Sequence, residues 1–301
     1  MARVLLVFVD GIGLGRPGAQ NPFDGAPVRA LAPLGGQPGD PRVTFGAIDA
    51  TLGHSGLPQS ATGQAAIFTG ADAIAVAGGH REGYPTRAVR ELIARSSFLA
   101  RARTSGRRVA LLNAFEGERA ARLTRVARGE EPFSRDVRLS ATALAALADG
   151  GELRTFADAR AGRAVTFDFT GEVCRAFGLQ AHRVSLDAAA RTLASAAAEV
   201  DLALFETFLT DKAGHSQDMV WARHEIARLE RFLAVLMDAV DPARQLVVIT
   251  SDHGNLEDLS TRSHTRAPVP LLALGAGAED FVRGARSLLD VAPRILASLV
   301  A

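Results

Sequence analysis

Three aspartates stand just after apolar segments of this sequence, at positions where side chains are free to do chemistry. Asp10 follows the segment 3–9, Asp211 follows 202–209, and Asp252 follows 246–249. Ligands of open α/β sheets bind at the carboxyl ends of the strands, so these carboxylates are the first candidates for a site. One such aspartate is often only a helix cap, but three of them are hard to explain by capping.

Histidines accompany two of these aspartates. His215 lies four residues after Asp211, and Gly214 between them permits a turn that would bring both side chains to one metal ion. His253 directly follows the third aspartate, and His264 comes eleven residues later. Carboxylate and imidazole ligands without thiolates suit manganese, zinc or iron. Six such ligands are enough for two ions, the arrangement that recurs in enzymes of phosphoester displacement.

Ser60 is the candidate nucleophile. It stands where the loop 56–59 meets a predicted helix, and the free N–H groups at a helix N-terminus attract anions. The alternatives are that Ser60 is a plain helix cap and that Thr62 carries the catalytic role. Positions two apart on a helix do not share a face, which favours Ser60 as the residue that faces the site.

Two further residues are candidates for binding a substrate. Lys212 lies between a candidate ligand aspartate and a candidate ligand histidine, where its charge would stabilise a phosphoryl group. His80 belongs to a Gly-rich loop after the predicted nucleophile helix. The alternatives are a solvated lysine and a surface turn.

The elements that position these residues alternate between two types, which predicts an α/β fold with a helix-covered, largely parallel central sheet. Continuous apolar runs predict buried strands at 3–9, 109–112, 202–208, 246–249 and 269–274. Amphipathic spacing predicts helices at 87–103, 186–199, 219–239 and 287–299. The Gly- and Pro-rich segment 15–42 is predicted to be a long loop.

The segment 116–182 has a different character, with charged stretches, a predicted helix at 140–148 and short strands at 153–156 and 164–169. We expect a catalytic core formed by residues 1–115 and 183–301, with 116–182 as a small insert or lid.

Composition limits the possible partners. The chain has 301 residues, 48% of them hydrophobic, and a net charge of +1 from 34 basic and 33 acidic residues. It can therefore bury a sizeable core, and no overall charge favours nucleic acid or a membrane surface. The single cysteine, Cys174, excludes an internal disulfide and is expected to be a buried apolar residue. No apolar run approaches the length of a membrane span, so we expect a soluble, cytoplasmic protein.

The order and spacing of these motifs resemble the metalloenzyme domain of the alkaline phosphatase superfamily, in particular cofactor-independent phosphoglycerate mutase and phosphopentomutase. The resemblance covers roughly residues 1–75 and 200–301. It rests on Asp10-Gly11, Ser60-Ala-Thr-Gly63, Asp211-Lys-Ala-Gly-His215, Asp252-His253-Gly254-Asn255 and His264-Thr265.

The resemblance implies a division of the ligands between two ions and a role for the serine. It places one ion on Asp10, Ser60, Asp252 and His253, and the other on Asp211, His215 and His264. It also implies that Ser60 is transiently phosphorylated. Two departures stand out, because those mutases have a much larger lid and carry a histidine where this chain has Gln64.

Together, the residues and the resemblance predict a phosphohydrolase, either a phosphomonoesterase or a phosphodiesterase, with two divalent ions, manganese or zinc. It would act on a small phosphorylated substrate through the phosphoserine that the resemblance implies. A phosphomutase is the alternative, because a closed chamber that retains the intermediate and excludes water would redirect the phosphoryl group. The short insert favours hydrolysis. A non-catalytic metal-binding protein is a second alternative, although no position of the ligand set is missing. The sequence does not predict an oligomeric state.

Overall fold

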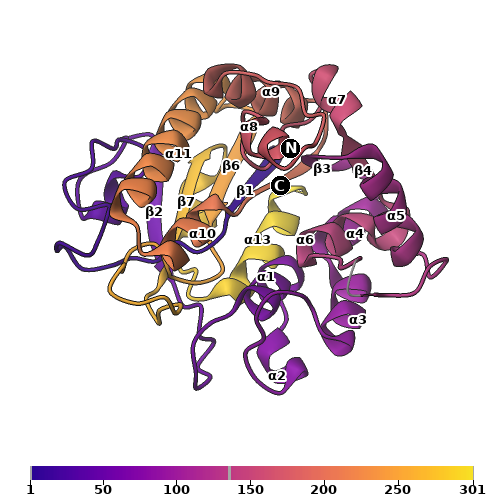
Figure 1. Ribbon diagram of the computed structural model, residues 1–301, viewed down its shortest axis with the longest axis horizontal. Helices are drawn as coiled ribbons and strands as arrows, with labels where there is room; N and C mark the ends of the chain where they lie inside the picture. Colours follow the sequence, from indigo (N-terminus) through magenta and orange to yellow (C-terminus); the bar gives the residue numbers. More distant parts are fainter. Residues whose placement is uncertain (1, 135–136, 301) are drawn as a thin grey trace.

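A computed structural model describes residues 2–134 and 137–300, within which seven strands form one sheet (Figure 1). The strand order is β2-β7-β6-β1-β5-β3-β4. The strands are β1 (Arg3–Val9), β2 (Val43–Ile48), β3 (Val109–Phe115), β4 (Leu153–Thr155), β5 (Leu202–Thr207), β6 (Gln245–Thr250) and β7 (Val269–Gly275).

The sheet is mostly parallel, as predicted. The central strand β1 pairs in parallel with β5 and β6, and only β7 runs antiparallel to its neighbours β6 and β2. All six residues of β6 are buried, as expected for a strand covered on both faces. The edge strand β2 was not predicted, because only one of its six residues is buried and it contains Gly46, so it lacks a continuous apolar run.

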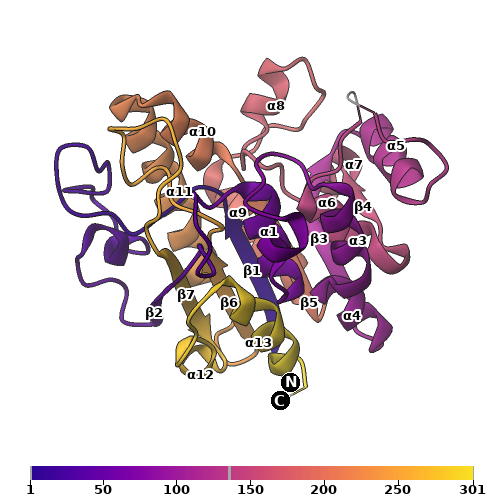
Figure 2. The same ribbon diagram turned by 90° about the horizontal axis from the view of Figure 1, so that it is seen from below.

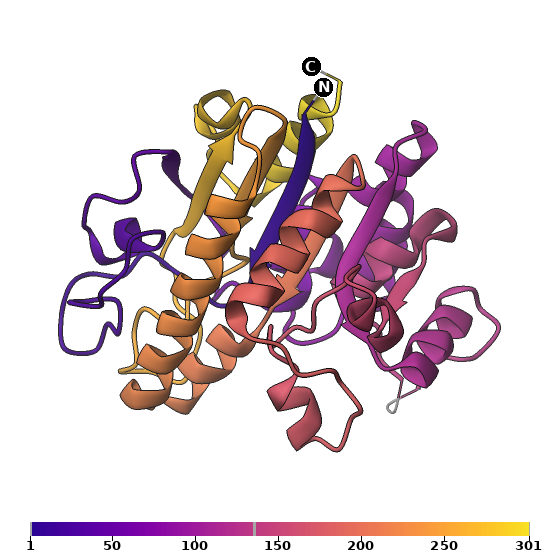
Figure 3. The same ribbon diagram turned by 90° about the horizontal axis from the view of Figure 1, so that it is seen from above.

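Helices cover both faces of the sheet. Figure 3 shows α9 (Leu186–Ala198) and α11 (Met219–Ala239) side by side over one face. The helices on the other face pack on a hydrophobic core of their own, and Figure 2 is viewed from their side. They are α1 (Ser60–Thr69), α3 (Arg87–Ser96), α4 (Phe98–Thr104), α6 (Ala141–Leu147), α12 (Ala278–Val282) and α13 (Val291–Ser298). The α/β class is thereby confirmed.

Local sequence explains where these helices begin and break. The carboxylate of Asp218 accepts hydrogen bonds from the backbone N–H groups of Val220 and Trp221, which starts α11 at the predicted residue. The single helix predicted at 87–103 is wrong, because Ser97 divides it into α3 and α4. Ser97 is fully buried with a non-helical ψ of 130°, and its hydroxyl donates to the carbonyl of Ala145.

The segment 116–182 contributes to the sheet and to the core beneath it. Its β4 pairs with β3, and its α6 packs against α1 and α3. Residues 164–169 make isolated bridges instead of the predicted strand. The division into a core (1–115 and 183–301) and an insert (116–182) stays a prediction.

The remaining elements are short. They are α2 (Ala73–Ala77), α5 (Gly117–Ala127), α7 (Phe156–Arg160), α8 (Glu172–Ala176), α10 (Leu209–Ser216) and the 3-10 turns Ala32–Gly35, Ala148–Gly150 and Leu288–Asp290. Across residues 2–134 and 137–300, no helix combines the length and the apolar character needed to cross a membrane.

Candidate active site

The three aspartates meet because their strands are neighbours. β1 lies between β5 and β6, with Val9 level with Thr207 and Phe8 level with Thr250. The carboxyl ends of these parallel strands therefore deliver their following residues to one edge of the sheet. The predicted histidines arrive at the same edge from α10 and from the loop before β7.

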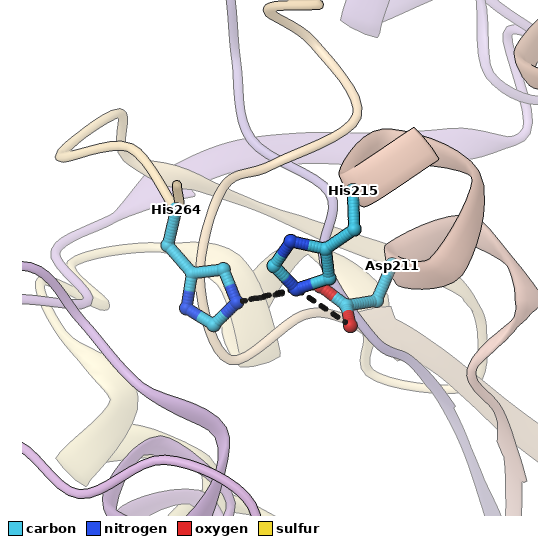
Figure 4. Close-up of side chains that lie close together, drawn as sticks. All are labelled: Asp211, His215 and His264. Carbon is cyan, nitrogen blue, oxygen red and sulfur yellow. Dashed lines mark hydrogen bonds and ion pairs between the residues drawn. The ribbon is translucent and has the colours of Figure 1, made fainter. Parts of the chain in front are cut away.

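One side of the cluster is formed by Asp211, His215 and His264, which Figure 4 shows facing one another. Nε2 of His215 lies 3.3 Å from Oδ2 of Asp211, and Nε2 of His264 lies 3.5 Å from Oδ1 of the same carboxylate. The two Nε2 atoms are 3.2 Å apart. We call these three residues the outer triad, because the side chain of His215 is 43% exposed.

Backbone carbonyls fix the orientation of both histidines in the outer triad. Nδ1 of His215 lies 2.7 Å from the carbonyl oxygen of Arg262, and Nδ1 of His264 lies 2.9 Å from that of Pro58. A carbonyl only accepts, so each Nδ1 carries the proton and donates it. When the rings are neutral, each Nε2 has a lone pair that faces the cluster, which is the usual arrangement of histidines that bind metals.

The other side is formed by Asp10, Asp252 and His253, which we call the inner triad. Asp252 and His253 are fully buried, and Asp10 is 7% exposed. Nε2 of His253 lies 3.4 Å from Oδ1 of Asp10 and 3.5 Å from Oδ2 of Asp252. Ligand atoms of Asp10, His253 and Asp211 lie within 4.8 Å of one another, so Asp211 links the two triads.

Burial and mutual repulsion dominate the electrostatics of the inner triad. Burial, together with the charge of Asp211, raises the pKa of Asp252 to about 7, and burial and the neighbouring carboxylates raise the pKa of Asp10 well above its ordinary value. Burial lowers the pKa of His253 to about 3. Burial also opposes ionisation of Asp211, but contacts with His264 and His253 outweigh it and lower this pKa to about 2.

The cluster fits a divalent cation on its own geometry. Among the described residues, the ion pairs of these aspartates are with histidines and not with lysine or arginine. The buried Oδ1 of Asp10 has no hydrogen-bond partner in the described chain. Buried carboxylates without a cation are costly, and lone pairs that face one another are unfavourable. Metal ions between these nitrogen and oxygen atoms would remove both penalties.

Gln64 holds the two carboxylates of the inner triad. Its amide nitrogen lies 3.3 Å from Oδ2 of Asp10 and 3.2 Å from Oδ2 of Asp252. The side chain projects from α1 and is buried. The residue that departs from the mutase pattern is therefore part of the cluster as a hydrogen-bond donor.

Asn255 orients the carboxylate that links the triads, donating to Oδ1 of Asp211 over 2.7 Å. The turn predicted at Gly214 is wrong, because Asp211 and His215 share the helix α10 and come together by its i, i+4 spacing. Gly214 is required for another reason, since a Cβ there would lie 2.6 Å from the side chain of Asn255. Gly11, with φ +74°, likewise leaves room for Asp211, 2.7 Å from the position of a Cβ.

Ser60 faces the inner triad and is not used as a helix cap. It is the first residue of α1, whose N-cap is Gln59, and its Oγ lies 2.9 Å from Nε2 of His253. Thr62 is fully buried, and its hydroxyl donates to the carbonyl of Gln59. The geometry thus separates the two hydroxyls as expected from their spacing on the helix.

Two cavities open beside the cluster, and both are bordered by Ser60, Asp211, Tyr84 and Arg138. The histidine cavity, of about 600 Å³, also contacts the outer triad. The apolar cavity, of about 450 Å³, is lined in addition by residues of the ranges 113–123 and 138–179.

The candidate substrate residues differ in their position relative to these cavities. Lys212 is exposed and lines the apolar cavity, with its ammonium 5.8 Å from the ring of Phe208. His80 packs against His54, with ring centroids 6.4 Å apart, and is not among the residues that line either cavity. The substrate role of both stays a prediction.

Sequence reasoning missed Arg138 and Glu206, which also line the apolar cavity. Arg138 lies in the segment 116–182, where no motif distinguished it from the other arginines. Glu206 had a usable signal, because it is a charged residue near the end of an apolar strand that leads to Asp211.

Comparison with known proteins identifies the family of this chain. A sequence profile of the Metalloenzyme superfamily matches residues 2–301. The chain is 33% identical over 94 residues to the 2,3-bisphosphoglycerate-independent phosphoglycerate mutase of Haloquadratum walsbyi, covering 29% of this chain and 19% of the mutase. The corresponding mutase of Halobacterium salinarum is 34% identical over 93 residues, covering 29% of this chain and 18% of the mutase. The matched segment thus spans less than a fifth of the length of either relative.

Solved structures share the fold over nearly the whole chain. The cold-active alkaline phosphatase of a psychrophilic Shewanella species superposes with a TM-score of 0.58 at 13% identity, covering 98% of this chain and 99% of that one. The phosphoglycerate mutase of Leishmania mexicana superposes with a TM-score of 0.52 at 14% identity, covering 99% and 95%. The chain therefore belongs to the Metalloenzyme superfamily and has an alkaline phosphatase-like fold.

Proposed function

We propose that this protein is a metal-dependent phosphohydrolase that acts on a small phosphorylated molecule through a phosphoserine at Ser60. The observation that carries the proposal is the position of the Ser60 hydroxyl. It lies 2.9 Å from His253 within a cluster of aspartates and histidines, and it borders both cavities. The first residue of a helix also offers free backbone N–H groups to an incoming phosphate.

Two divalent ions, manganese or zinc, would complete the site. Asp211, His215 and His264 would hold one ion, and Asp10, Ser60, Asp252 and His253 would hold the other. When bound, the ions would lower the pKa of the serine hydroxyl and neutralise the charge of the phosphoryl oxygens. Mixed oxygen and nitrogen ligands support these metals over magnesium.

The protein's own residues would bind and orient the reacting groups. The guanidinium of Arg138 and the ammonium of Lys212 line the apolar cavity and are exposed, so they are available to a phosphate. Ser60 Oγ forms a bond to phosphorus as the bond between phosphorus and the substrate oxygen breaks. The alcohol leaves with the proton that Ser60 gives up. Water then splits the phosphoserine into inorganic phosphate and free Ser60.

Solvent access supports hydrolysis over transfer to a second hydroxyl of the substrate. A mutase must retain its substrate and exclude water until the phosphoryl group returns. Here the side chain of His215 is 43% exposed beside the histidine cavity. Water can therefore reach the cluster from that side.

The test is release of inorganic phosphate from p-nitrophenyl phosphate by protein stripped of metal and then loaded with Mn²⁺ or Zn²⁺. We expect activity only after loading and its loss in Ser60→Ala. Ser55→Ala, in the exposed part of the preceding loop, is the matched control and should retain activity. Absence of turnover in fully loaded protein across sugar phosphates, nucleotides and phosphodiesters would support a non-catalytic metal-binding protein. Transfer to a substrate hydroxyl faster than to water would establish a mutase.

A further inference from the structure

The apolar cavity differs in chemistry from the cluster that it adjoins. Apolar side chains supply most of its inner wall, and a cavity of about 450 Å³ is within the usual range for sites that bind organic ligands, roughly 300–1,000 Å³. A three-carbon acid would leave much of this space unfilled. The main wall residues are Phe115, Leu123, Phe156, Phe167, Leu179 and Phe208.

The wall is an organised structure. The rings of Phe167 and Phe208 stack with centroids 4.4 Å apart and planes inclined by 16°. Phe156 and Cys174 are buried in a small apolar cluster, separate from the two main cores, on which Phe167 and Leu179 pack. Burial raises the pKa of the Cys174 thiol to about 12, so this cysteine serves as an apolar wall residue and not as a second nucleophile.

Charged groups have distinct places around the cavity. Arg119, Arg138 and Lys212, the three basic residues that line it, are exposed, and Arg138 also lines the histidine cavity. Glu206 is only partly exposed, and among the described residues no lysine or arginine forms an ion pair with it. Asn113 fixes the strand at this point, exchanging two 2.8 Å hydrogen bonds with the backbone of Glu206. A substrate carboxylate would be unfavourable beside the carboxyl group of Glu206, which has no cationic partner among the described residues, whereas an apolar group would not.

We propose that the apolar cavity binds the alcohol portion of the substrate, and that the substrate is a phosphomonoester of an aromatic or branched apolar alcohol. The inference rests on the proposed function, because Ser60 is the point at which the phosphoryl group would be held. Arg138, which lines both cavities, and Lys212, which follows Asp211, would contact the phosphate, and the aromatic wall would enclose the alcohol. Removal of an apolar ring from water supplies the binding energy.

The test compares benzyl phosphate with glycerol 1-phosphate, two esters of primary alcohols that differ mainly in the apolar ring. In metal-loaded protein we expect kcat/KM to favour benzyl phosphate by roughly 10- to 100-fold, the effect of burying one ring. Phe167→Ala should lower kcat/KM for benzyl phosphate by about tenfold and leave glycerol 1-phosphate within about twofold. Phe177→Ala is the matched control, because this phenylalanine of the same segment is 77% exposed and does not line the cavity. It should change neither value.

Binding of phosphonates separates this inference from the proposed hydrolysis. Calorimetry should find that benzylphosphonate binds more tightly than methylphosphonate and that Phe167→Ala removes the difference. If this difference in binding is found but neither ester is turned over, the substrate class is supported and the proposed hydrolysis is overturned. Turnover with no preference for benzyl phosphate would overturn the substrate class alone. If Phe167→Ala does not fold, Leu179→Trp, which narrows the cavity, is used in its place. It must weaken the binding of benzylphosphonate and leave the binding of methylphosphonate unchanged. Equal binding of the two phosphonates by the unmodified protein would overturn the inference.

Discussion

The two triads of the cluster contain the same residue types in very different surroundings. The inner triad is buried, and burial raises the pKa of Asp252 to about 7. The outer triad includes a histidine that is 43% exposed, and its carboxylate, Asp211, has a pKa lowered to about 2. The pKa of Asp211 favours its charged form without any metal, whereas desolvation and repulsion disfavour the charged form of Asp252. The comparison indicates that the inner triad depends more strongly on a bound cation than the outer triad does.

The largest expected effect comes from removing a charge in the inner triad. Asp252→Asn keeps the shape of a fully buried side chain but removes a proposed ligand, so kcat/KM should fall by about three orders of magnitude or more, as when a member of a catalytic unit is lost. The metal-free variant should also unfold at a higher temperature, because a strained buried carboxylate is gone. Kinetics, metal analysis and calorimetry check this. Asp258→Asn, outside both triads, is the control. Full activity in Asp252→Asn would contradict the assignment.

The outer triad should be less sensitive. His215→Ala removes an exposed ligand whose place water can take, so we expect affinity for one ion to fall by about 100-fold and activity to recover at high metal concentration. His224→Ala, an exposed histidine of α11, is the control. Metal titration followed by calorimetry would measure the difference. Loss of both ions, or activity that no metal concentration restores, would remove the distinction between the triads.

Gln64 offers a finer test of the inner triad. Its amide donates to both buried carboxylates, and Gln64→Ala would leave them without this support. Loss of an outer partner of a metal site commonly costs about 10- to 100-fold in affinity or activity, and we expect the lower end here because the ligands themselves remain. Gln64→Glu should have a larger effect, since it adds a third carboxylate. An unchanged metal affinity in Gln64→Ala would mean that the amide only fills space.

The smallest effect concerns stability and pH in the metal-free protein. The pKa values of Asp252 and Glu206 are about 7 in the folded protein, against ordinary values of 3.8 and 4.5, and that of Asp10 is raised too. The folded state therefore holds protons that the unfolded chain releases, so these groups lower stability as pH rises from about 4 to 7. The pKa of His253 is lowered from 6.5 to about 3, so this group has the opposite effect and raises stability as pH rises.

His264, whose pKa is raised, although burial opposes this, by its contact with Asp211, acts with the carboxylates, and His80, whose pKa burial lowers, acts with His253. Four groups against two predict a net fall of several degrees in the unfolding temperature between pH 5 and 7. Bound ions need deprotonated ligands, so Mn²⁺ should flatten or reverse this slope. Calorimetry with EDTA and with Mn²⁺ makes the comparison. An unfolding temperature that rises with pH in EDTA would show that the pKa values of the inner carboxylates are not raised as described.

The sequence predicted the fold where the local pattern of apolar and polar residues is sufficient. β1 and α11 were found at their full bounds, because one is a continuous apolar run and the other a capped amphipathic helix. Ser97 and β2 were missed because their conformations depend on tertiary contacts, a buried hydroxyl bond in one case and pairing with β7 in the other. The family could also be predicted, because its motifs are short stretches of sequence that directly follow the ends of apolar strands.

The site was predictable as a set of residues but not in its geometry. Asp10, Asp211 and Asp252 could be brought together from the order of the strands. The sequence could not reveal that Asp211 joins both triads, or that Gln64 bridges the two inner carboxylates. Arg138 and four of the six main wall residues come from the segment 116–182, whose chain path follows from packing and carries no local signature.

The most direct test of the account is the identity of the residue that carries phosphate during turnover. Metal-loaded protein would be mixed with p-nitrophenyl phosphate, quenched in acid and digested, and its peptides analysed by mass spectrometry. We expect a phosphate on Ser60, which lies 2.9 Å from His253, and none in Ser60→Ala. Phosphate on Thr62, or steady turnover in Ser60→Ala, would contradict it.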